Sequence, residues 1–186
     1  MVYLVGYLIF LFLELIIAVS LCAFALSLLF SSFMGSPYVP TKQKELLFFL
    51  KEAGIKKGQV FIELGCGDGR VVRAAVREYG ARGFGLDINP LLIWWARLRT
   101  WFAGVRNIEY RTQNIFNADI AQADIVYLFL MPELIAKLSD KLNRELKEGS
   151  LVISHGFKVK GWEPYLEKTI SHKPFPTYYY RIKKTS

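Results

Sequence analysis

The stretch that decides the fold is Phe61-Ile-Glu-Leu-Gly-Cys-Gly-Asp-Gly-Arg70. A short, mostly apolar run that is typical of a buried strand leads directly into three glycines at alternate positions, and a helical pattern follows at once. Glycine lets the backbone turn tightly and lets a ligand approach the main chain. The sequence therefore predicts an α/β unit whose first strand and helix are joined by a ligand-binding turn.

The chain on both sides of this turn alternates short apolar runs with helical patterns. Strands are predicted over residues 59–64, 84–88, 108–112, 124–130 and 151–155. Helices are predicted over residues 42–53, 68–79, 90–103 and 133–146. Two further strands, 165–171 and 177–182, are expected as an antiparallel pair at the sheet edge. Such alternation is typical of an α/β domain with a mostly parallel sheet.

Asp87 ends the second predicted strand, where its carboxylate can accept hydrogen bonds from both ribose hydroxyls of a nucleoside. A dinucleotide fingerprint, G-x-G-x-x-G, would have its last glycine where Arg70 stands, and Gly69 comes one residue early. The acids Glu63 and Asp68 beside the turn would repel a phosphate but suit a cationic ligand. The charge therefore favours S-adenosyl-L-methionine (AdoMet), which carries a sulfonium and an ammonium group.

These two segments resemble the class I AdoMet-dependent methyltransferases. VFIELGCGDGRVV (residues 60–72) is similar to the first motif of that family, and GFGLDINP (residues 83–90) is similar to the second. The resemblance covers about residues 41–184. It implies a Rossmann-like, seven-stranded methyltransferase sheet with helices on both faces and an antiparallel last strand.

The resemblance also implies which residues hold the cofactor. The methionine part of AdoMet would lie along the glycine turn, Asp87 would bind the ribose and Ile88 would pack on the adenine. Many members carry an Asp at the adenine edge after the third strand; Gln113-Asn114 stands there instead, and Asn114 can still hydrogen-bond the adenine amino group. The predicted cofactor-binding residues are Thr41, Glu63, Gly65, Cys66, Gly67, Asp68, Gly69, Asp87, Ile88 and Asn114.

The methyl acceptor is usually bound at the carboxyl end of the fourth strand in this fold. The segment there, ADIVYLFLMPE (residues 123–133), lacks the N-P-P-Y type tetrapeptide of amide- and adenine-methylating relatives and the paired-Glu loop of arginine methyltransferases. An apolar, aromatic wall remains, and such surroundings lower the pKa of a lysine ammonium and favour its nucleophilic amine. Tyr127 and His155 are the candidate catalytic residues, with a purely structural role as the alternative for each; no metal site is predicted.

The first 34 residues form an apolar leader whose only acid is Glu14. A helix of that length spans about 50 Å, more than the hydrocarbon core of about 30 Å. A cleaved signal peptide would need basic residues in front and a shorter apolar core. All 24 Lys and Arg lie at or after Lys42, so the positive-inside rule places the domain that follows in the cytoplasm. We predict a single-pass membrane anchor over 1–34, a linker over 35–41 and a methyltransferase domain over 42–186.

The charge of the chain bears on its partners. With 53% hydrophobic residues the chain is not a disordered one, and the part after Met34 carries 24 basic and 15 acidic residues, or +9. This charge could attract nucleic acid, but beside a membrane span anionic headgroups are the simpler partner. Trp94, Trp95 and Trp101 are better explained as core or membrane-interface residues than as a base-stacking platform. We predict the bilayer and a membrane protein as partners, and no nucleic acid.

One subfamily matches the whole layout: an apolar leader, P-Y-V-P-T at 37–41, the glycine turn, Y-L-F-L-M-P-E at 127–133 and S-H-G-F at 154–157 followed by G-W. This layout resembles the small lysine methyltransferases that include the mitochondrial enzymes for the c-type subunit of ATP synthase and for the adenine nucleotide translocase. The resemblance implies an AdoMet-dependent protein-lysine N-methyltransferase acting on a membrane protein, with residues 37–41 folding over the cofactor. A methyltransferase for a lipid, quinone or other membrane-dissolved small molecule is the alternative, and a non-catalytic binding module is a third possibility.

Overall fold

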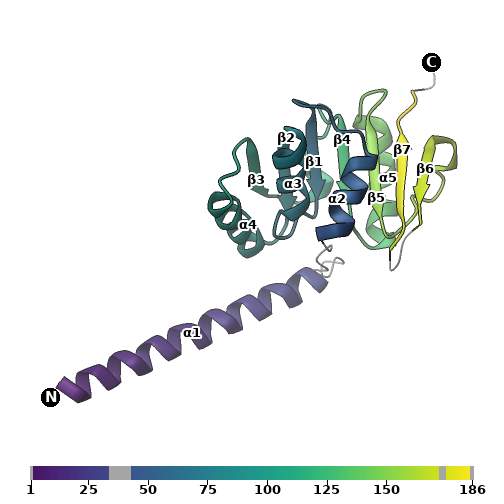
Figure 1. The fold of residues 1–186 in the computed structure, drawn as a ribbon. Coiled ribbons are helices and arrows are strands. Elements are labelled where there is room, and N and C mark those ends of the chain that lie inside the picture. The colour runs from purple at the N-terminus through teal and green to yellow at the C-terminus, as the bar shows by residue number, and fades with distance from the viewer. Residues whose placement is uncertain (1, 34–42, 172–174, 185–186) are drawn as a thin grey trace.

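A seven-stranded sheet organises the domain in this computed structural model, which describes residues 2–33, 43–171 and 175–184 (Figure 1). The strands are β1 (Val60–Leu64), β2 (Arg82–Asp87), β3 (Ile108–Thr112), β4 (Ile125–Leu128), β5 (Leu151–His155), β6 (Leu166–Ile170) and β7 (Thr177–Arg181). Their order is β3-β2-β1-β4-β5-β7-β6. The first five strands are parallel, and β7 is antiparallel to both of its neighbours, as predicted.

Helices cover both faces of the sheet, because parallel strands must be shielded from water on each side. The helices are α2 (Gln43–Glu52), α3 (Arg70–Tyr79), α4 (Pro90–Phe102) and α5 (Pro132–Glu145), with short 3-10 turns η1 (Ile115–Asn117) and η2 (Glu163–Tyr165). Apolar residues of α2, α3 and α4 share one core with the sheet, and those of α5 share the other. The predicted Rossmann-like sheet with helices on both faces is therefore confirmed.

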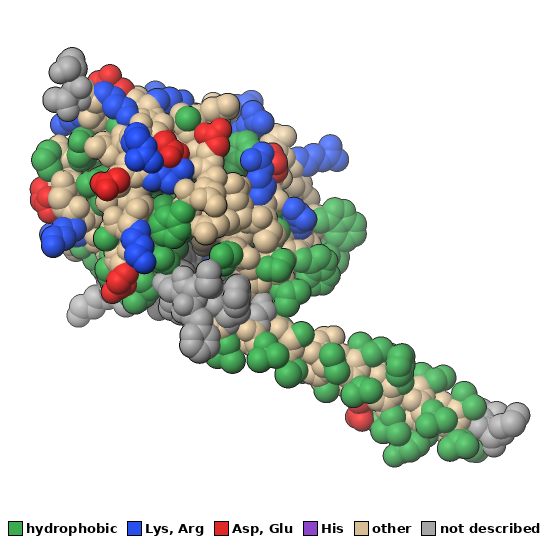
Figure 2. All heavy atoms as spheres, turned by 180° about the vertical axis from the view of Figure 1, so that it is seen from behind, with side chains coloured by type: hydrophobic (Ala, Val, Ile, Leu, Met, Phe, Trp, Pro, Cys, Tyr) green, Lys and Arg blue, Asp and Glu red, His purple; other side chains and the backbone are tan. Residues whose placement is uncertain are grey.

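The apolar leader is one helix, α1 (Val2–Phe33), that extends away from the domain (Figure 1). Its segment Tyr3–Leu26 is 24 residues long and apolar enough to cross a membrane, and none of it is buried in the protein. Hydrophobic side chains cover this helix on the face that Figure 2 shows. Length and composition therefore permit a transmembrane span.

Most element boundaries lie within two residues of their predicted positions, and the differences have local causes. The helix predicted from Asp68 begins at Arg70, because Gly69 adopts a left-handed conformation with φ of 68° that cannot continue a helix. The apolar pattern of α2 includes Leu47, yet Leu47 is 37% exposed, whereas Leu46 and Leu50 are fully buried. One helical turn separates buried positions by three or four residues, so Leu47 points away from the core.

Tyr110 on β3 explains why β2 carries a glycine at position 85. The two residues are paired neighbours in the sheet, and a Cβ atom on Gly85 would lie 2.6 Å from Tyr110 Cδ1 and 3.0 Å from Cys66 Sγ. A Cβ atom on Gly69 would lie 2.4 Å from the Tyr110 hydroxyl oxygen. The tyrosine ring therefore occupies the space that two missing side chains leave between the sheet and the glycine turn.

Gly85→Ala tests this packing, because the backbone of β2 is extended and tolerates alanine. We expect the overpacked methyl group to lower the free energy of unfolding by about 1–3 kcal/mol, measured by urea denaturation. In a Tyr110→Leu background the same substitution should cost less, since the ring that it meets is gone. Strictly additive effects of the two substitutions would show that Tyr110 is not what excludes a side chain at position 85.

Candidate active site

The turn between β1 and α3 is held open by glycine conformations. Gly65, Gly67 and Gly69 have φ of 76°, 53° and 68°, in the left-handed region that favours glycine. The backbone N–H groups of Gly65 and Cys66 both donate to the carbonyl oxygen of Leu86 on β2, at 2.8 and 2.9 Å. The Cys66 thiol is buried, and this burial raises its pKa well above the ordinary value. Cys66 therefore contributes its main chain to the turn rather than a reactive thiolate.

Asp87 connects the glycine turn to α4. Its Oδ2 accepts a hydrogen bond from the Gly67 N–H at 2.8 Å, and its Oδ1 accepts one from the Asn89 N–H at 2.9 Å. Asn89 in turn caps α4 by accepting from the Leu91 and Leu92 N–H groups. Burial raises the pKa of the Asp87 carboxyl although these backbone donors oppose the shift. The Ile88 N–H also acts on this carboxylate, whose two oxygens offer about four lone-pair sites in all.

Glu63 on β1 lies beneath the start of α3. Its Oε2 accepts a hydrogen bond from the Val72 N–H at 2.8 Å, which satisfies one of the unpaired donors in the first turn of that helix. Burial raises the pKa of the Glu63 carboxyl well above its ordinary value, and the nearby charges of Asp68 and Asp87 raise it further. Glu63 therefore serves the architecture of the turn as well as its electrostatics.

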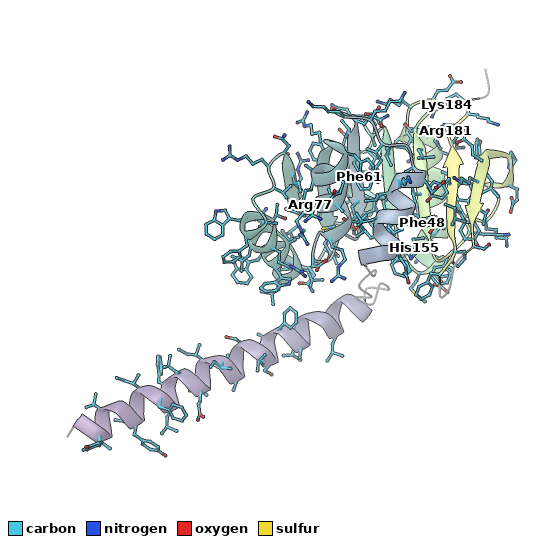
Figure 3. The ribbon with its side chains drawn as sticks, viewed as in Figure 1. Phe48, Phe61, Arg77, His155, Arg181 and Lys184 are labelled. Atoms are coloured by element: carbon cyan, nitrogen blue, oxygen red, sulfur yellow. The ribbon has the colours of Figure 1, made fainter. Side chains whose placement is uncertain are left out.

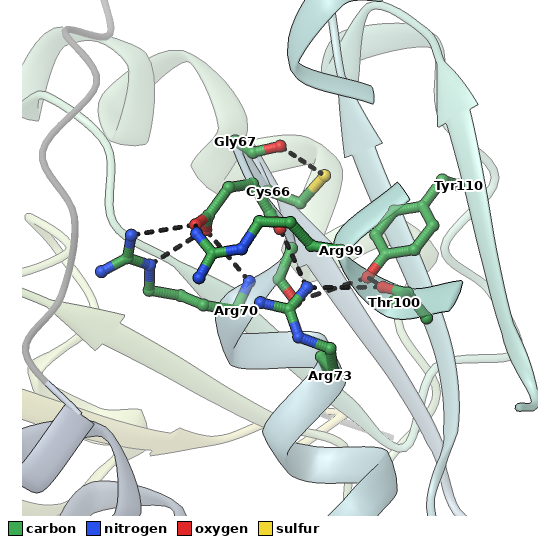
Figure 4. Close-up of polar contacts among 9 residues, drawn as sticks. Cys66, Gly67, Arg70, Arg73, Arg99, Thr100 and Tyr110 are labelled. Carbon is green, nitrogen blue, oxygen red and sulfur yellow. Dashed lines mark hydrogen bonds and ion pairs between the residues drawn. The ribbon is translucent and has the colours of Figure 1, made fainter. Parts of the chain in front are cut away.

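The negative charge of Asp68, which the sequence analysis took to favour a cationic ligand, forms ion pairs with two arginines. Its carboxylate accepts hydrogen bonds from Arg70 at 2.9 Å and from Arg99 of α4 at 2.5 Å (Figure 4). Burial opposes ionisation, but these arginines hold the pKa of Asp68 below its ordinary value. The negative charge that the sequence places at Asp68 is therefore offset by Arg70 and Arg99. The other carboxylates beside the turn are Glu63 and Asp87, which are both buried, and burial raises the pKa of each.

A buried polar network that the sequence analysis missed supports the turn from below (Figure 4). Arg73 donates to the Asp68 carbonyl oxygen at 3.1 Å and to Thr100 Oγ1 at 3.4 Å. Thr100 Oγ1 lies 2.8 Å from the Tyr110 hydroxyl, which donates to the Gly69 carbonyl oxygen at 3.4 Å. The only signal in the sequence is an arginine inside the apolar run Val71–Val76 of α3, which by itself indicates no particular role.

Residues at the expected adenine edge also lie at the carboxyl end of β2 and β3. Ile88 is half-buried, and Asn114 accepts a hydrogen bond from the Phe116 N–H at 3.0 Å as the cap of η1. The Gln113 N–H donates to the Asp87 carbonyl oxygen at 2.8 Å, which fixes this loop beside Asp87. The structure thus brings Asp87, Ile88 and Asn114 to one edge. The predicted contact of Thr41 lies outside the described residues.

The two candidate catalytic residues belong to one aromatic cluster, Phe49, Tyr127, Phe129, His155 and Phe175. The ring of Tyr127 stacks on Phe49 of α2 with centroids 5.2 Å apart, and it lies 6.4 Å from the His155 ring. His155 contacts Phe129 edge to face at 4.7 Å, and its Nδ1 lies 2.8 Å from Thr177 Oγ1. Tyr127 and His155 are each 1% exposed. Figure 3 shows His155 near the start of α2.

The aromatic cluster and the glycine turn lie at the same edge of the sheet. Leu64, the last residue of β1, pairs with Leu128, the last residue of β4, so both strands end at one level. A Cβ atom on Gly65 would lie 2.8 Å from Leu130, which shows that the turn touches the segment after β4. A group bound along the turn would therefore lie beside the aromatic cluster.

Comparison with known proteins identifies the family. A family model described as the ANTKMT methyltransferase domain matches residues 63–166. A protein-lysine N-methyltransferase of Saccharolobus islandicus (strain REY15A) is 35% identical over 135 residues, which cover 69% of this chain and 81% of that protein. A lysine N-methyltransferase of Mus musculus, named for the C-type subunit of ATP synthase, is 33% identical over 129 residues, 69% of this chain. The chain matches only 51% of the length of that mouse protein.

A solved structure extends the comparison to the cofactor. An RNA methyltransferase from Salinibacter ruber, in complex with S-adenosyl-L-homocysteine, superposes with a TM-score of 0.76 and 35% identity. The match covers 80% of this chain and 96% of that one. S-adenosyl-L-homocysteine is what AdoMet becomes after it has given up its methyl group. The chain belongs to the ANTKMT methyltransferase family and is an AdoMet-dependent methyltransferase.

Proposed function

We propose that the protein is a membrane-anchored protein-lysine N-methyltransferase whose acceptor is a membrane protein. The observation that carries this proposal is the combination of α1 with a family whose relatives are named for lysine methylation of an ATP synthase subunit and of adenine nucleotide translocase. In this proposal residues 1–34 anchor the chain, 35–41 form the linker and 42–186 form the catalytic domain. The absence of basic residues before Lys42 supports a cytoplasmic domain.

The chemistry of the described residues fits AdoMet, which supplies an electrophilic methyl group when bound. Three left-handed glycines give the turn the shape along which the methionine part would lie, and the Glu63 carboxylate is held beside the first turn of α3. Beyond its backbone donors the Asp87 carboxylate keeps acceptor capacity for the ribose, and Ile88 and Asn114 lie at the adjacent edge for the adenine. We therefore assign these residues, with Cys66, Asp68 and Thr41, to the cofactor site.

The aromatic cluster suits a lysine acceptor. Aromatic faces attract an ammonium group, and the apolar surroundings lower its pKa so that the neutral amine, which is the nucleophile, becomes accessible. We propose that Tyr127 and His155 form the floor of this acceptor pocket and that Thr177 orients the His155 ring. Phe49 covers both rings, at 5.2 Å from Tyr127 and 5.3 Å from His155. Because Phe49 belongs to α2, movement of that helix would admit the acceptor side chain.

Asp87→Asn tests the cofactor site. Loss of charge-assisted hydrogen bonds to the ribose and to the Gly67 N–H should weaken AdoMet binding by about 10- to 100-fold, as measured by calorimetry. Glu109→Gln is the matched control, because Glu109 is an exposed carboxylate of β3 whose partner is Arg111. Equal AdoMet affinity in Asp87→Asn and in the wild-type protein would contradict the assignment.

AdoMet binding should also depend on pH through Asp87. Burial raises the pKa of this carboxyl above its ordinary value of 3.8. Only the ionised form is negatively charged and accepts hydrogen bonds on both oxygens. We therefore expect the affinity to fall as the pH is lowered through this raised pKa, at a higher pH than an ordinary aspartate would give. In Asp87→Asn this part of the profile should vanish. A wild-type profile that stays flat down to the ordinary pKa would rule out this role.

Labelling with AdoMet carrying a radioactive methyl group tests the proposed acceptor class. Membranes that contain the full-length protein should acquire label in a protein band, and mass spectrometry should place the methyl group on lysine. Label that extracts into organic solvent would assign the enzyme to a lipid or quinone, and label in RNA would assign it to the activity named for the Salinibacter ruber relative. Either result would replace the lysine proposal.

The same assay tests the aromatic cluster. Tyr127→Phe keeps the ring that stacks on Phe49 and removes only the hydroxyl group. If Tyr127 helps to position the acceptor, the turnover number should fall while AdoMet affinity stays at the wild-type value. Unchanged turnover would leave Tyr127 with a packing role alone.

A further inference from the structure

Helix α4 has two apolar faces, and among the residues that the structure describes only one of these faces has packing partners. Leu92, Ile93 and Ala96 are buried against the sheet. A second row, which we call the outer stripe, runs along the opposite side of the helix at a spacing of three or four residues. It consists of Leu91, Trp94, Trp95, Leu98, Trp101 and Phe102.

The outer stripe is unusually apolar for an exposed surface. Trp94 is 61% exposed, and Trp101 and Phe102 are each 73% exposed. The aromatic rings lie in pairs, with centroids 6.5 Å apart for Trp94 and Trp95 and 4.8 Å apart for Trp101 and Phe102. Figure 2 shows hydrophobic side chains gathered over α4 at the right-hand edge of the domain. A contiguous patch of this kind marks an interaction site rather than an ordinary water-facing surface.

Two arginines border the outer stripe. At about 100° per residue, Arg97 and Arg99 fall on opposite sides of the row of aromatic residues. Arg97 donates to the Tyr110 carbonyl oxygen at 2.6 Å, and Arg99 bonds Asp68, so the protein holds both guanidinium groups at the margins of the stripe. Both arginines are exposed. Tryptophan and phenylalanine between cationic margins are typical of a helix that lies in the plane of a membrane interface.

The position of α4 in the fold brings the stripe near the predicted membrane span. Both α2 and α4 begin at the carboxyl edge of the sheet, since α4 follows β2 directly and α2 runs back to the start of β1. Only residues 34–42 separate α1 from α2, and a chain of that length reaches at most about 35 Å. If α1 crosses a bilayer, the surface of that bilayer is therefore always within reach of this edge.

We infer that the outer stripe of α4 is a second membrane contact, which inserts into the headgroup region of the bilayer that α1 crosses. This contact holds the carboxyl edge of the sheet, with the glycine turn and the aromatic cluster, against the membrane surface. Arg99 joins the stripe to the turn directly through Asp68. The inference rests on the anchoring part of the proposed function, and it limits the acceptor to lysines close to the membrane surface.

The distribution of tryptophan makes this inference directly measurable. The chain has four tryptophans, of which three lie in the outer stripe; the fourth, Trp162, is buried, and α1 has none. The full-length protein would be placed, one copy per disc, in nanodiscs of phosphatidylcholine and phosphatidylserine whose acyl chains are brominated near the glycerol end. Bromine quenches tryptophan at contact. We expect most of the tryptophan emission to be lost relative to unbrominated discs.

Matched variants identify the side chains that are quenched. Trp162→Phe should be quenched at least as strongly as the wild-type protein, whereas a variant with phenylalanine at positions 94, 95 and 101 should keep its emission. The double substitution Trp101→Glu and Phe102→Glu should prevent the stripe from inserting into the headgroup region. The emission of the two remaining stripe tryptophans should then be restored. Ala136→Glu with Lys137→Gln changes the net charge equally on exposed positions of α5, and this control should be quenched like the wild-type protein.

Equal emission of the wild-type protein in brominated and unbrominated discs would overturn the inference. If bromine does not quench the emission but the emission shifts to the blue when two copies share a disc, the stripe binds a second copy of the chain instead. The measurement involves no methyl transfer, so it is independent of the acceptor. If tryptophan is quenched but no lysine is labelled, the proposed membrane contact of the outer stripe stands and the lysine proposal falls. If lysine is labelled but tryptophan is not quenched, only the proposed membrane contact falls.

Discussion

The buried carboxylate of Asp87 is the interaction on which the site depends. One of its oxygens holds the Gly67 N–H of the glycine turn, and the other holds the Asn89 N–H at the start of α4. The two segments diverge from neighbouring strands, and both leave backbone donors that need an acceptor at the edge of the sheet. A single ionisable group thus fixes the shape of the turn and the direction of α4. Burial disfavours the charged form of this carboxylate and so raises its pKa, while the backbone hydrogen bonds partly offset that effect.

Helix α4 connects the glycine turn to the outer surface of the molecule. It is capped by Asn89, it carries Arg99 back to Asp68 in the glycine turn, and its Thr100 contacts the Tyr110 hydroxyl. A helix held at these points cannot shift without disturbing the turn. The aromatic residues on its outer side are therefore held in a fixed position relative to the proposed cofactor site. A surface that binds these residues would set the orientation of that site.

The proposed acceptor side of the site is built differently from the proposed cofactor side. The proposed cofactor side consists of main chain and carboxylates, whereas the proposed acceptor side is a cluster of rings from α2, β4 and the residue after it, β5 and the segment before β7. This division suits a transfer from a polar, charged donor to a lysine that must become neutral before it reacts. In the proposed function α2, which supplies Phe49, is the element whose position controls entry of the acceptor.

The sequence alone determined the order of strands and helices, the glycine turn, Asp87 and the apolar leader. These features depend on local patterns, such as the periodicity of apolar residues, the freedom of glycine and the end of a strand. The start of α3 at Arg70, two residues later than predicted, is a small departure that the left-handed conformation of Gly69 explains.

Only the tertiary structure decided which groups meet across long separations in the chain. Arg99 neutralises Asp68 from 31 residues away, Tyr110 fills the space beside Gly69, and Phe49 covers Tyr127. The structure also showed which of the two apolar faces of α4 packs on the sheet and which is left exposed. A pattern of side chains fixes the face of its own helix or strand, but its partners depend on how the chain folds back, and no local periodicity records that.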